Sequence, residues 1–308
     1  MPPYPRIWNK SFDSSLSVKK NTSPRERVKM TYTVARDEVK TLGSISYFEA
    51  PSMKALGLVN HAFCTRCGGV SHGSYSSLNL GERNGDDRTR VQRNRDLVVK
   101  TFDIAPGQLI TMNQVHGDRI WIIDRSLSPS TSSSETPYDA ILTDQRGIAI
   151  GVLTADCVPI LLVDTRHLAI GIIHAGWRGT LLGIARKALH KMTLHFGTYP
   201  EDLFVAIGPS IGECCYEVDE AVTGPFRSSK WDWQAFTKPK GEHKWFMNLA
   251  EATIEQMRAC GIRDEQCCCI RVCTACNTDM LFSNRVEGPR TGRQISFIQL
   301  REDDVDGP

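Results

Sequence analysis

Three apolar runs between residues 147 and 174 constrain the fold of this chain more than any other feature. They are "GIAIGVL" (147–153), "VPILLVD" (158–164) and "LAIGIIH" (168–174), and each is short and bounded by turn residues. A continuous apolar run of this length, without alternation of apolar and polar residues, is typical of a strand that is buried on both faces. The three runs therefore predict buried strands in a sheet that other elements cover.

Further strands are expected along the rest of the chain, which alternates short strands with a few helices. Their apolar or alternating patterns lie at 119–124, 203–208, 267–272 and 293–300. Mixed sheets covered by helices are the predicted architecture, although periodicity alone does not give the strand order.

Two segments have the spacing of amphipathic helices. In the first, apolar residues recur at intervals of three and four from Thr180, and Gly197 suits its end. The second is expected to begin at Asn248, with Glu251 as its N3 partner, and to end at Gly261.

The length of 308 residues allows one large domain or two ordinary ones. The low-complexity stretch 126–137 is predicted to be an exposed loop that interrupts one domain. Residues 1–44 are rich in Pro, Ser and Lys and are predicted to be a weakly ordered extension. The predicted functional domain spans residues 45–302, and residues 303–308 form a tail.

Charge and hydropathy exclude several classes of function. The net charge of +2 is close to balance, which argues against general affinity for nucleic acid or membrane. No apolar run approaches the roughly 20 residues that span a bilayer, and the first residues lack the apolar region of a secretory signal. Eleven cysteines without an export signal predict free thiols in a reducing compartment, hence a cytoplasmic protein.

Five of the cysteines lie in "QCCCIRVCTAC" (266–276). Adjacent cysteines in such a run can simply be small hydrophobic side chains of a strand. A zinc site is the alternative, in which Cys273 and Cys276 pair with Cys64 and Cys67, although the two pairs are far apart in the sequence.

Three residues beside predicted strands are of the types that bind a metal ion. His116 lies in "NQVHGD", Cys157 in "TADC" and His174 in "HAGWRG". Because the ends of neighbouring strands converge, these side chains can meet at one point. Two imidazoles and one thiolate suit Zn²⁺, and three protein ligands leave a fourth position open, as in catalytic zinc sites. Asp156 could orient a ligand or transfer a proton.

Other roles for the same residues stay open at this point. A cysteine in a buried strand usually packs, and a histidine before glycine is usually a surface or capping residue. Cys157 could instead be a nucleophile with His174 as its base, which would leave His116 without a role.

Arginines beside glycines form a second group of candidates. Arg66 lies in "TRCGGVS" and Arg178 in "GWRG", just ahead of the predicted helix, where anions bind readily. Arg285, Arg290 and Arg293 lie in "SNRVEGPRTGR". These residues make a substrate that carries or uses phosphate credible, with Arg66 and Arg178 as the candidates for its pocket.

Seven motifs in order resemble one known family. They are "FCTRCGGVSHGSYSSLNLG" followed by "GDD" and "NR", then "NQVHGD", "DAILTD", "TADCVPILL", "IHAGWRG", "AIGPSIGECCYEV" and "FSNRVEGPRTGRQ". The chain from about residue 46 to 300 is thereby similar to the laccase-like multicopper polyphenol oxidase family, which is also described as the purine nucleoside phosphorylase or peptidoglycan editing factor family.

The resemblance implies a single α+β domain, a layered α/β/β/α arrangement with mixed sheets related to the catalytic domain of cytotoxic necrotizing factor. It implies that His116, Cys157 and His174 match the family's zinc ligands. Asn79, in the first motif, joins Arg66 and Arg178 as an expected substrate-binding residue, while Asp156, Cys157 and His174 are the expected catalytic residues.

The implied activities are phosphorolysis of adenosine, inosine, guanosine or methylthioadenosine, and hydrolytic deamination of adenosine. The expected partners are purine nucleosides and phosphate, with the chain a monomer or a homodimer. Two departures from the family pattern are small. Ser210 is not one of the expected zinc ligands, and the second departure, "LFSNRV", lies in the stretch that holds Arg285.

Three alternative functions remain. A peptidoglycan-precursor editing hydrolase would cleave an amide at the same site, and a binding module would hold zinc at a closed site with four ligands. A polyphenol oxidase would bind Cu²⁺. Multicopper oxidation needs about ten histidines, often in His-x-His pairs, and this chain has eight and no such pair.

Overall fold

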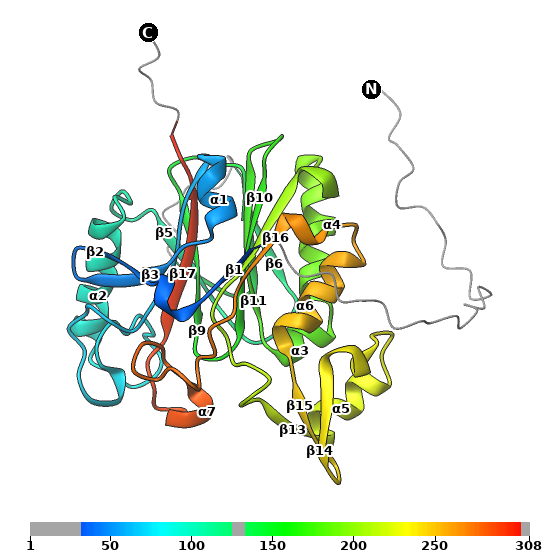
Figure 1. The fold of residues 1–308 in the computed structure, drawn as a ribbon. Coiled ribbons are helices and arrows are strands. Elements are labelled where there is room, and N and C mark those ends of the chain that lie inside the picture. Colours follow the sequence, from blue (N-terminus) through cyan, green and yellow to red (C-terminus); the bar gives the residue numbers. More distant parts are fainter. Residues whose placement is uncertain (1–31, 125–132, 303–308) are drawn as a thin grey trace, which may run out of the picture.

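Two seven-stranded sheets form the centre of the protein, in a computed structural model that describes residues 32–124 and 133–302 (Figure 1). The first sheet has the order β1 (Tyr32–Val34), β16 (Cys267–Ile270), β12 (Leu203–Ile207), β10 (Val158–Asp164), β11 (Ala169–Ala175), β8 (Ala140–Thr143) and β6 (Ile120–Ile123). The second has the order β2 (Lys40–Leu42), β3 (Ile45–Phe48), β4 (Val59–Cys64), β17 (Gln294–Leu300), β9 (Ala149–Thr154), β5 (Leu109–Asn113) and β7 (Ser133–Pro137).

The remaining elements cover the sheets or extend from one end. A small sheet consists of β13 (Glu217–Asp219), β15 (Lys244–Met247) and β14 (Thr237–Gly241). The helices are α1 (Pro51–Leu56), α2 (Arg88–Thr101), α3 (Trp177–Leu181), α4 (Ile184–Phe196), α5 (Glu220–Arg227), α6 (Leu249–Arg258) and α7 (Asn284–Glu287). The 3₁₀ helices are Arg36–Glu38, Gly73–Tyr75, Pro200–Asp202, Trp233–Phe236 and Asp264–Gln266.

The layers follow the order α/β/β/α, as predicted. In Figure 1, α2 lies outside the second sheet, and α4 and α6 lie outside the first sheet on the opposite side. The interface between the two sheets is one apolar core, the interface of the first sheet with its helices is another, and a smaller core lies under α2. Both large sheets contain parallel and antiparallel pairs, so the predicted mixed α+β fold is confirmed.

The central strands are apolar throughout because each one contributes to two cores. In β10, Ile160 and Leu162 pack toward the helices, whereas Leu161 and Val163 pack toward the second sheet. Side chains of successive residues in a strand point to opposite faces, so a strand covered on both faces has no polar side to show. This confirms the interpretation of the three apolar runs as buried strands.

The cysteines of β16 are packing residues. Cys267 and Cys269 belong to the core beneath the helices, and Cys268 belongs to the core between the sheets. All three are almost completely buried, which is the role that adjacent cysteines were expected to have in such a strand.

The helices differ from the predictions at their starts. The segment expected to begin at Thr180 is two helices, because Gly183 adopts a left-handed conformation (φ of 74°) between α3 and α4. Gly197 ends α4 in the same conformation, as predicted. Asn248 caps α6 by accepting a hydrogen bond from the Glu251 N–H, but the Glu251 carboxylate pairs with an arginine of the same helix and does not complete a capping box.

Two predicted segment boundaries need correction. Residues 1–31 and 303–308 lie outside the described residues, but residues 32–42 of the predicted extension already contribute β1 and β2 to the large sheets. Within the predicted loop 126–137, residues 126–132 are not described, and residues 133–137 form β7, which pairs with β5. Neighbouring strands at the sheet edges thus supply partners that local composition does not reveal.

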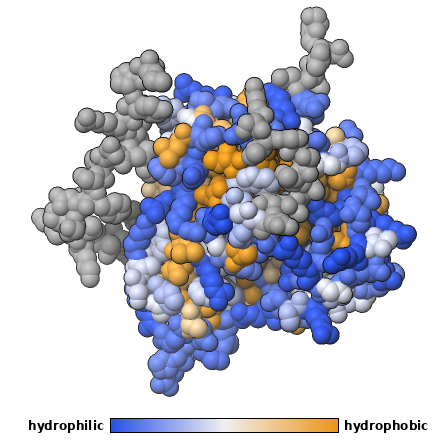
Figure 2. Space-filling view, turned by 180° about the vertical axis from the view of Figure 1, so that it is seen from behind, coloured by the Kyte–Doolittle hydropathy of each residue, from blue (hydrophilic) through white to orange (hydrophobic). Residues whose placement is uncertain are grey.

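The face seen from behind is mostly hydrophilic, with apolar side chains gathered toward its middle (Figure 2). The described large apolar side chains that are exposed lie singly along the chain: Leu42, Val70, Val115, Leu182, Leu194 and Val286. Within the ranges that the structure describes, no helix combines the length and the apolar character that crossing a membrane requires.

The packing of the two sheets predicts the effect of one truncation. Leu161→Ala removes a fully buried side chain from the core between the sheets, and we expect it to lower the free energy of unfolding by about 2–5 kcal/mol. Leu194→Ala is the matched control, because Leu194 is 67% exposed, and it should change stability by less than about 0.5 kcal/mol. Urea denaturation would measure the free energy of unfolding of both variants. Equal losses in the two variants would contradict the assignment of Leu161 to the core.

Candidate active site with a metal-binding cluster

His116, Cys157 and His174 come together at one end of the two large sheets. His116 lies in the loop that follows β5, Cys157 in the turn between β9 and β10, and His174 is the last but one residue of β11. Strands β5 and β9 run parallel and therefore end at the same edge. Strand β10 begins opposite the end of β11, since Val158 pairs with Ala175.

The three side chains are close enough for one ion to lie between them. Their candidate ligand atoms all lie within 4.8 Å of one another. The two imidazole rings meet edge to face, with centroids 4.8 Å apart and an interplanar angle of 77°. Imidazole nitrogens and a thiolate are ligands of Zn²⁺ and of other transition metals, so the cluster has a donor set that can hold such a metal.

The cluster opens on one side into a large cavity. His174 is buried, Cys157 is half-buried and His116 is exposed. All three line a cavity of about 1320 Å³. A ligand bound to the cluster would therefore be reached from the His116 side, while the sheet closes the other.

Asp139 holds the two histidines in place. Its Oδ1 lies 2.8 Å from His174 Nδ1 and accepts a hydrogen bond from the His116 N–H at 3.0 Å. Its Oδ2 accepts hydrogen bonds from the N–H groups of Gly117 and Val115. A carboxylate on Nδ1 leaves Nε2 free to bind a metal and fixes the orientation of the ring. Asp139 is thus part of the site.

Sequence reasoning did not identify Asp139 as a site residue. The available signal was a carboxylate directly before a short apolar strand, in "YDAIL", where nothing local could pair with it. Asp139 is completely buried, and a buried charge needs hydrogen-bond partners. Those partners come from the His116 loop and from β11, which the order of residues does not bring near.

The charges of the cluster favour a thiolate. Burial disfavours ionisation of Cys157, but the positive charge of His174 and contacts with His116 lower its pKa to about 6. Burial likewise disfavours the imidazolium of His174, but the Cys157 thiolate and the Asp139 carboxylate raise its pKa to about 9. The thiolate is the form of cysteine that binds metals and attacks electrophiles, so the cluster has its reactive sulfur available at neutral pH.

Because Gly176 has no side chain, the side chains of His116 and Cys157 can occupy the space beside it. A Cβ atom on this residue would lie 2.8 Å from Cδ2 of His116 and 3.1 Å from the Cys157 sulfur. Gly176 directly follows β11 and precedes α3. A side chain at this position would therefore push the loop of His116 away from the other two residues.

Asp156 lies next to the cluster but is held by the protein itself. Its Oδ1 accepts hydrogen bonds from the hydroxyls of Thr274 and Ser283, and its Oδ2 accepts one from the Arg285 N–H. Asp156 also has a positive φ of 91°, which strains an L-residue. These contacts fix the turn that carries Cys157, and they leave acceptor capacity on Oδ2.

Arg66 and Asn79 form hydrogen bonds within the protein and lie outside the lining of the cavity. The Arg66 guanidinium donates to the carbonyl oxygens of Ser76 and Thr278 and pairs with Glu287 at 2.7 Å. Asn79 is completely buried and accepts hydrogen bonds from the N–H groups of Gly81 and Arg293. Neither lines the cavity. Both residues thus have structural contacts in the loops beside the site, and their expected contact with substrate stays a prediction.

Arg178 lines the cavity, and its expected contact with an anion stays a prediction. Its guanidinium lies over the Trp177 ring, 4.4 Å from the centroid, and the side chain is exposed. Within residues 32–124 and 133–302 no carboxylate forms an ion pair with it. Arg285 and Arg293 also line the cavity but donate hydrogen bonds to backbone carbonyl groups, whereas Arg290 is exposed and outside the lining.

The alternative zinc site built from Cys64, Cys67, Cys273 and Cys276 is wrong. Cys64 is buried in β4, and the Cys67 sulfur contacts the carbonyl oxygen of Asp279. Cys273 and Cys276 instead lie beside Cys214 and Cys215. The pairing of distant cysteines depends on how the loops fold back, which sequence spacing does not specify.

A family model and the sequences of known proteins match most of this chain. Residues 60–301 match the family model described as multi-copper polyphenol oxidoreductase laccase. A relative from Bacteroides thetaiotaomicron named purine nucleoside phosphorylase is 36% identical over 256 residues, which cover 82% of this chain and 95% of the relative. A relative from Geobacillus stearothermophilus named purine nucleoside phosphorylase YlmD is 35% identical over 248 residues, covering 78% and 89%.

A solved structure has the same fold. The hypothetical protein YfiH from Bacillus licheniformis superposes with a TM-score of 0.78 at 28% sequence identity, over 86% of this chain and 100% of that chain.

The Asp139 contacts predict that this residue controls metal affinity. Asp139→Asn places an amide nitrogen where a carboxylate oxygen now accepts hydrogen bonds, and we expect metal affinity to fall by about 10–100-fold. Competition with a chelator would measure it. Asp164→Asn is the matched control, because Asp164 is equally buried and holds His167 at 3.1 Å at the opposite end of β10 from Cys157. Unchanged affinity in Asp139→Asn, or an equal loss in both variants, would contradict the prediction.

Proposed function

The chain belongs to the multi-copper polyphenol oxidoreductase laccase family, and within it we propose a zinc-dependent purine nucleoside phosphorylase whose metal ligands are His116, Cys157 and His174. The observation that carries the proposal is the open cluster of two imidazoles and one thiolate on the wall of a cavity that also presents Arg178. Relatives named purine nucleoside phosphorylase support an enzyme of this kind.

The donor set of the cluster suits a catalytic zinc ion better than the copper centres of a multicopper oxidase. Three protein ligands of the nitrogen and sulfur type, with one open side, are the usual arrangement of catalytic zinc. A multicopper oxidase needs many more histidines than the two in this cluster. Among the residues that the structure describes, the groups of side chains that could hold a metal ion contain no other histidine. When bound, the ion would supply a positive charge that stabilises negative charge developing on an atom in contact with it.

Phosphate is proposed to bind at Arg178. In phosphorolysis, a phosphate oxygen forms a bond to C1′ of the ribose while the bond from C1′ to N9 of the purine breaks. The purine leaves with the bonding electrons and takes up the proton that phosphate releases. An exposed guanidinium without a carboxylate partner can pair with phosphate through two hydrogen bonds. Arg178 would thereby hold the nucleophile within reach of the cluster.

Two aromatic side chains are proposed to hold the purine. Trp177 and Tyr216 both line the cavity, and the flat faces of aromatic rings stack on bases. Asp139 would keep the His174 ring in one orientation throughout the reaction.

Adenosine deamination is proposed as a second activity of the same centre. Zinc deaminases of nucleobases also use histidine and cysteine ligands, together with a carboxylate that transfers protons. Asp156 is the cavity-lining carboxylate next to Cys157, and the acceptor capacity left on its Oδ2 suits this role. The proposed nucleosides are adenosine, inosine, guanosine and methylthioadenosine.

One assay separates these activities. The purified chain would be analysed for bound metals and then incubated with adenosine or inosine, with and without phosphate. Free base formed only with phosphate supports phosphorolysis, and inosine formed from adenosine without phosphate supports deamination. If neither product appears when zinc is bound at His116, Cys157 and His174, both activities are refuted and a cell-wall precursor amide becomes the substrate to test.

Removal of a ligand should stop turnover. Cys157→Ala and His174→Ala should each lower kcat/KM by at least about 100-fold, more than the loss typical of residues that only orient a ligand. Circular dichroism should show an intact fold. His167→Ala is the control, since His167 lies in the turn after β10 and pairs with Asp164. Activity retained in either ligand variant would remove that residue from the site.

Arg178→Ala should weaken phosphate binding. Hydrogen bonds to charged groups contribute about 1.5–3 kcal/mol, so we expect the KM for phosphate to rise about tenfold or more with a smaller change in the KM for nucleoside. Arg166→Ala is the matched control, because Arg166 also lies over an aromatic ring, that of Tyr199, but is not part of the cavity lining. An unchanged KM for phosphate would place the phosphate pocket elsewhere.

A further inference from the structure

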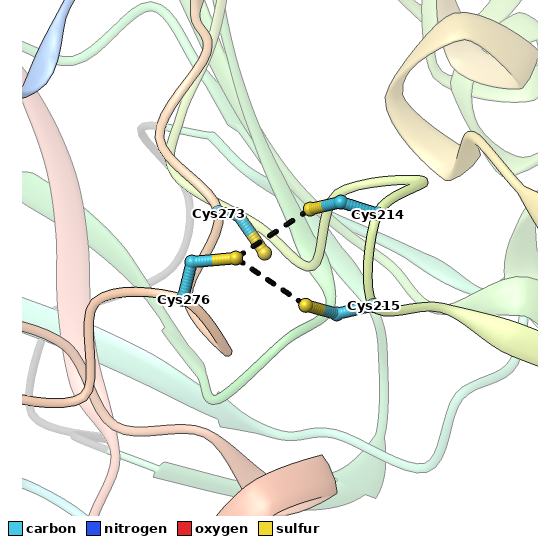
Figure 3. A group of neighbouring side chains, drawn as sticks. All are labelled: Cys214, Cys215, Cys273 and Cys276. Carbon is cyan, nitrogen blue, oxygen red and sulfur yellow. Dashed lines mark hydrogen bonds between the residues drawn. The ribbon is translucent and has the colours of Figure 1, made fainter.

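Four cysteines form a second cluster, separate from the residues of the proposed active site. Cys214 and Cys215 lie in the segment between β12 and β13, and Cys273 and Cys276 lie after β16. Figure 3 shows their side chains pointing toward one another from these two segments. All four sulfurs lie within 4.8 Å of one another, and the Cys276 sulfur is 3.6 Å from that of Cys214 and 3.3 Å from that of Cys215.

We propose that Cys214, Cys215, Cys273 and Cys276 bind a second metal ion, Zn²⁺, through four thiolates, and that this site is structural.

The spacing of the sulfurs fits this ion. Four thiolates around Zn²⁺ at about 2.3 Å stand at the corners of a tetrahedron and lie about 3.8 Å apart. The observed sulfur separations of 3.6 and 3.3 Å are close to this value, and far longer than the roughly 2.05 Å of a disulfide bond. Cys273 and Cys276 have the two-residue spacing that is common in zinc sites. The cluster provides four ligands and thus a closed site, in contrast to the three ligands beside the cavity.

The local backbone brings the sulfurs together. The Gly212 N–H donates a hydrogen bond to the Cys273 sulfur at 3.2 Å, a contact that stabilises the thiolate. The N–H groups of Cys215 and Tyr216 both donate to the Gly212 carbonyl oxygen, and this tight turn directs the two adjacent cysteines to one side. A Cβ on Gly212 would lie 3.2 Å from the Cys214 sulfur, so the turn approaches the cluster closely.

Hydrophobic packing does not account for these four residues. The cysteines of β16 are buried in the cores, but Cys214 and Cys276 are exposed and the other two are only half-buried. Cysteine is among the most buried residue types when it serves as a small apolar side chain. Four partly exposed thiols that converge on one point are instead typical of a metal site.

The ion would fasten two segments that position the active site. Ile211 donates its N–H to the Asp156 carbonyl oxygen, and the Thr274 hydroxyl donates to the Asp156 carboxylate. These two residues belong to the two cysteine-bearing segments, and Asp156 directly precedes Cys157. A bridge between the segments would therefore hold the turn of Cys157 from both sides.

Metal counting tests the proposal independently of activity. The full chain, purified under reducing conditions with Zn²⁺, should contain two equivalents, and His174→Ala should contain one. Adding Cys276→Ser to His174→Ala should remove the second equivalent, whereas adding Cys67→Ser, at a half-buried cysteine outside the cluster, should leave it. Cys214→Ser is a second variant in case Cys276→Ser fails to fold.

Cobalt binding provides a readout on a chain in which all four cysteines of the second cluster are present. Co²⁺ added to the metal-free His174→Ala variant should give the intense visible absorption of tetrahedral cobalt thiolate, and one equivalent of Zn²⁺ should abolish it and protect four thiols from a thiol reagent. A retained second equivalent in the combined variant with Cys276→Ser, the absence of the cobalt thiolate spectrum, or a disulfide among these cysteines under reducing conditions would each overturn the proposal. If the full chain contains two equivalents of Zn²⁺ but does not catalyse phosphorolysis, the proposed function is refuted and the proposal of a zinc site at the four cysteines stands.

Discussion

The pairing of β10 with β11 is the contact on which the candidate site depends. Pro159 lies opposite His174 and Val158 opposite Ala175, so the first residue before β10, Cys157, is placed beside the histidine at the end of β11. A shift of one residue in this register would turn every side chain of a strand to the other face. The two cores on either side of β10 oppose such a shift, because both faces are filled with large apolar side chains. Burial of these strands thus also fixes the distance between sulfur and imidazole.

Asp139 contributes a buried negative charge to the candidate site. It lies between the His116 loop and β11 and accepts hydrogen bonds from both. Removing a carboxylate from water is unfavourable unless donors replace the water, and here three backbone N–H groups and an imidazole do so. The buried charge in turn favours protonated His174, which favours the Cys157 thiolate. The polar network therefore sets the chemical state of the cluster, while the sheets set its shape.

Apolar runs and helix spacing, which are local signals, predicted the strands, the helices and mixed sheets covered by helices, whereas the order of the layers was an implication of the family resemblance. The sequence also predicted three residues whose side chains the structure brings together, since their types and their positions at strand ends are local as well. It did not predict Asp139, the structural roles of Arg66 and Asn79, or the partners of Cys273. Each of these depends on which loops meet: Arg66, for example, is satisfied by a carbonyl group and a carboxylate more than two hundred positions away. Hydrogen bonds over such separations leave no periodic pattern.

The unequal burial of the three residues beside the cavity has a kinetic consequence. His174 is buried within β11, whereas His116 is exposed on a loop that only backbone hydrogen bonds tie to Asp139, and it has a positive φ of 60°. Exchange of an ion would then proceed through the movement of this one loop, with the sulfur and the inner imidazole remaining in place. The rates of loading and escape would depend on how often the His116 loop opens, and they could change without any change in the sheets that make the protein stable.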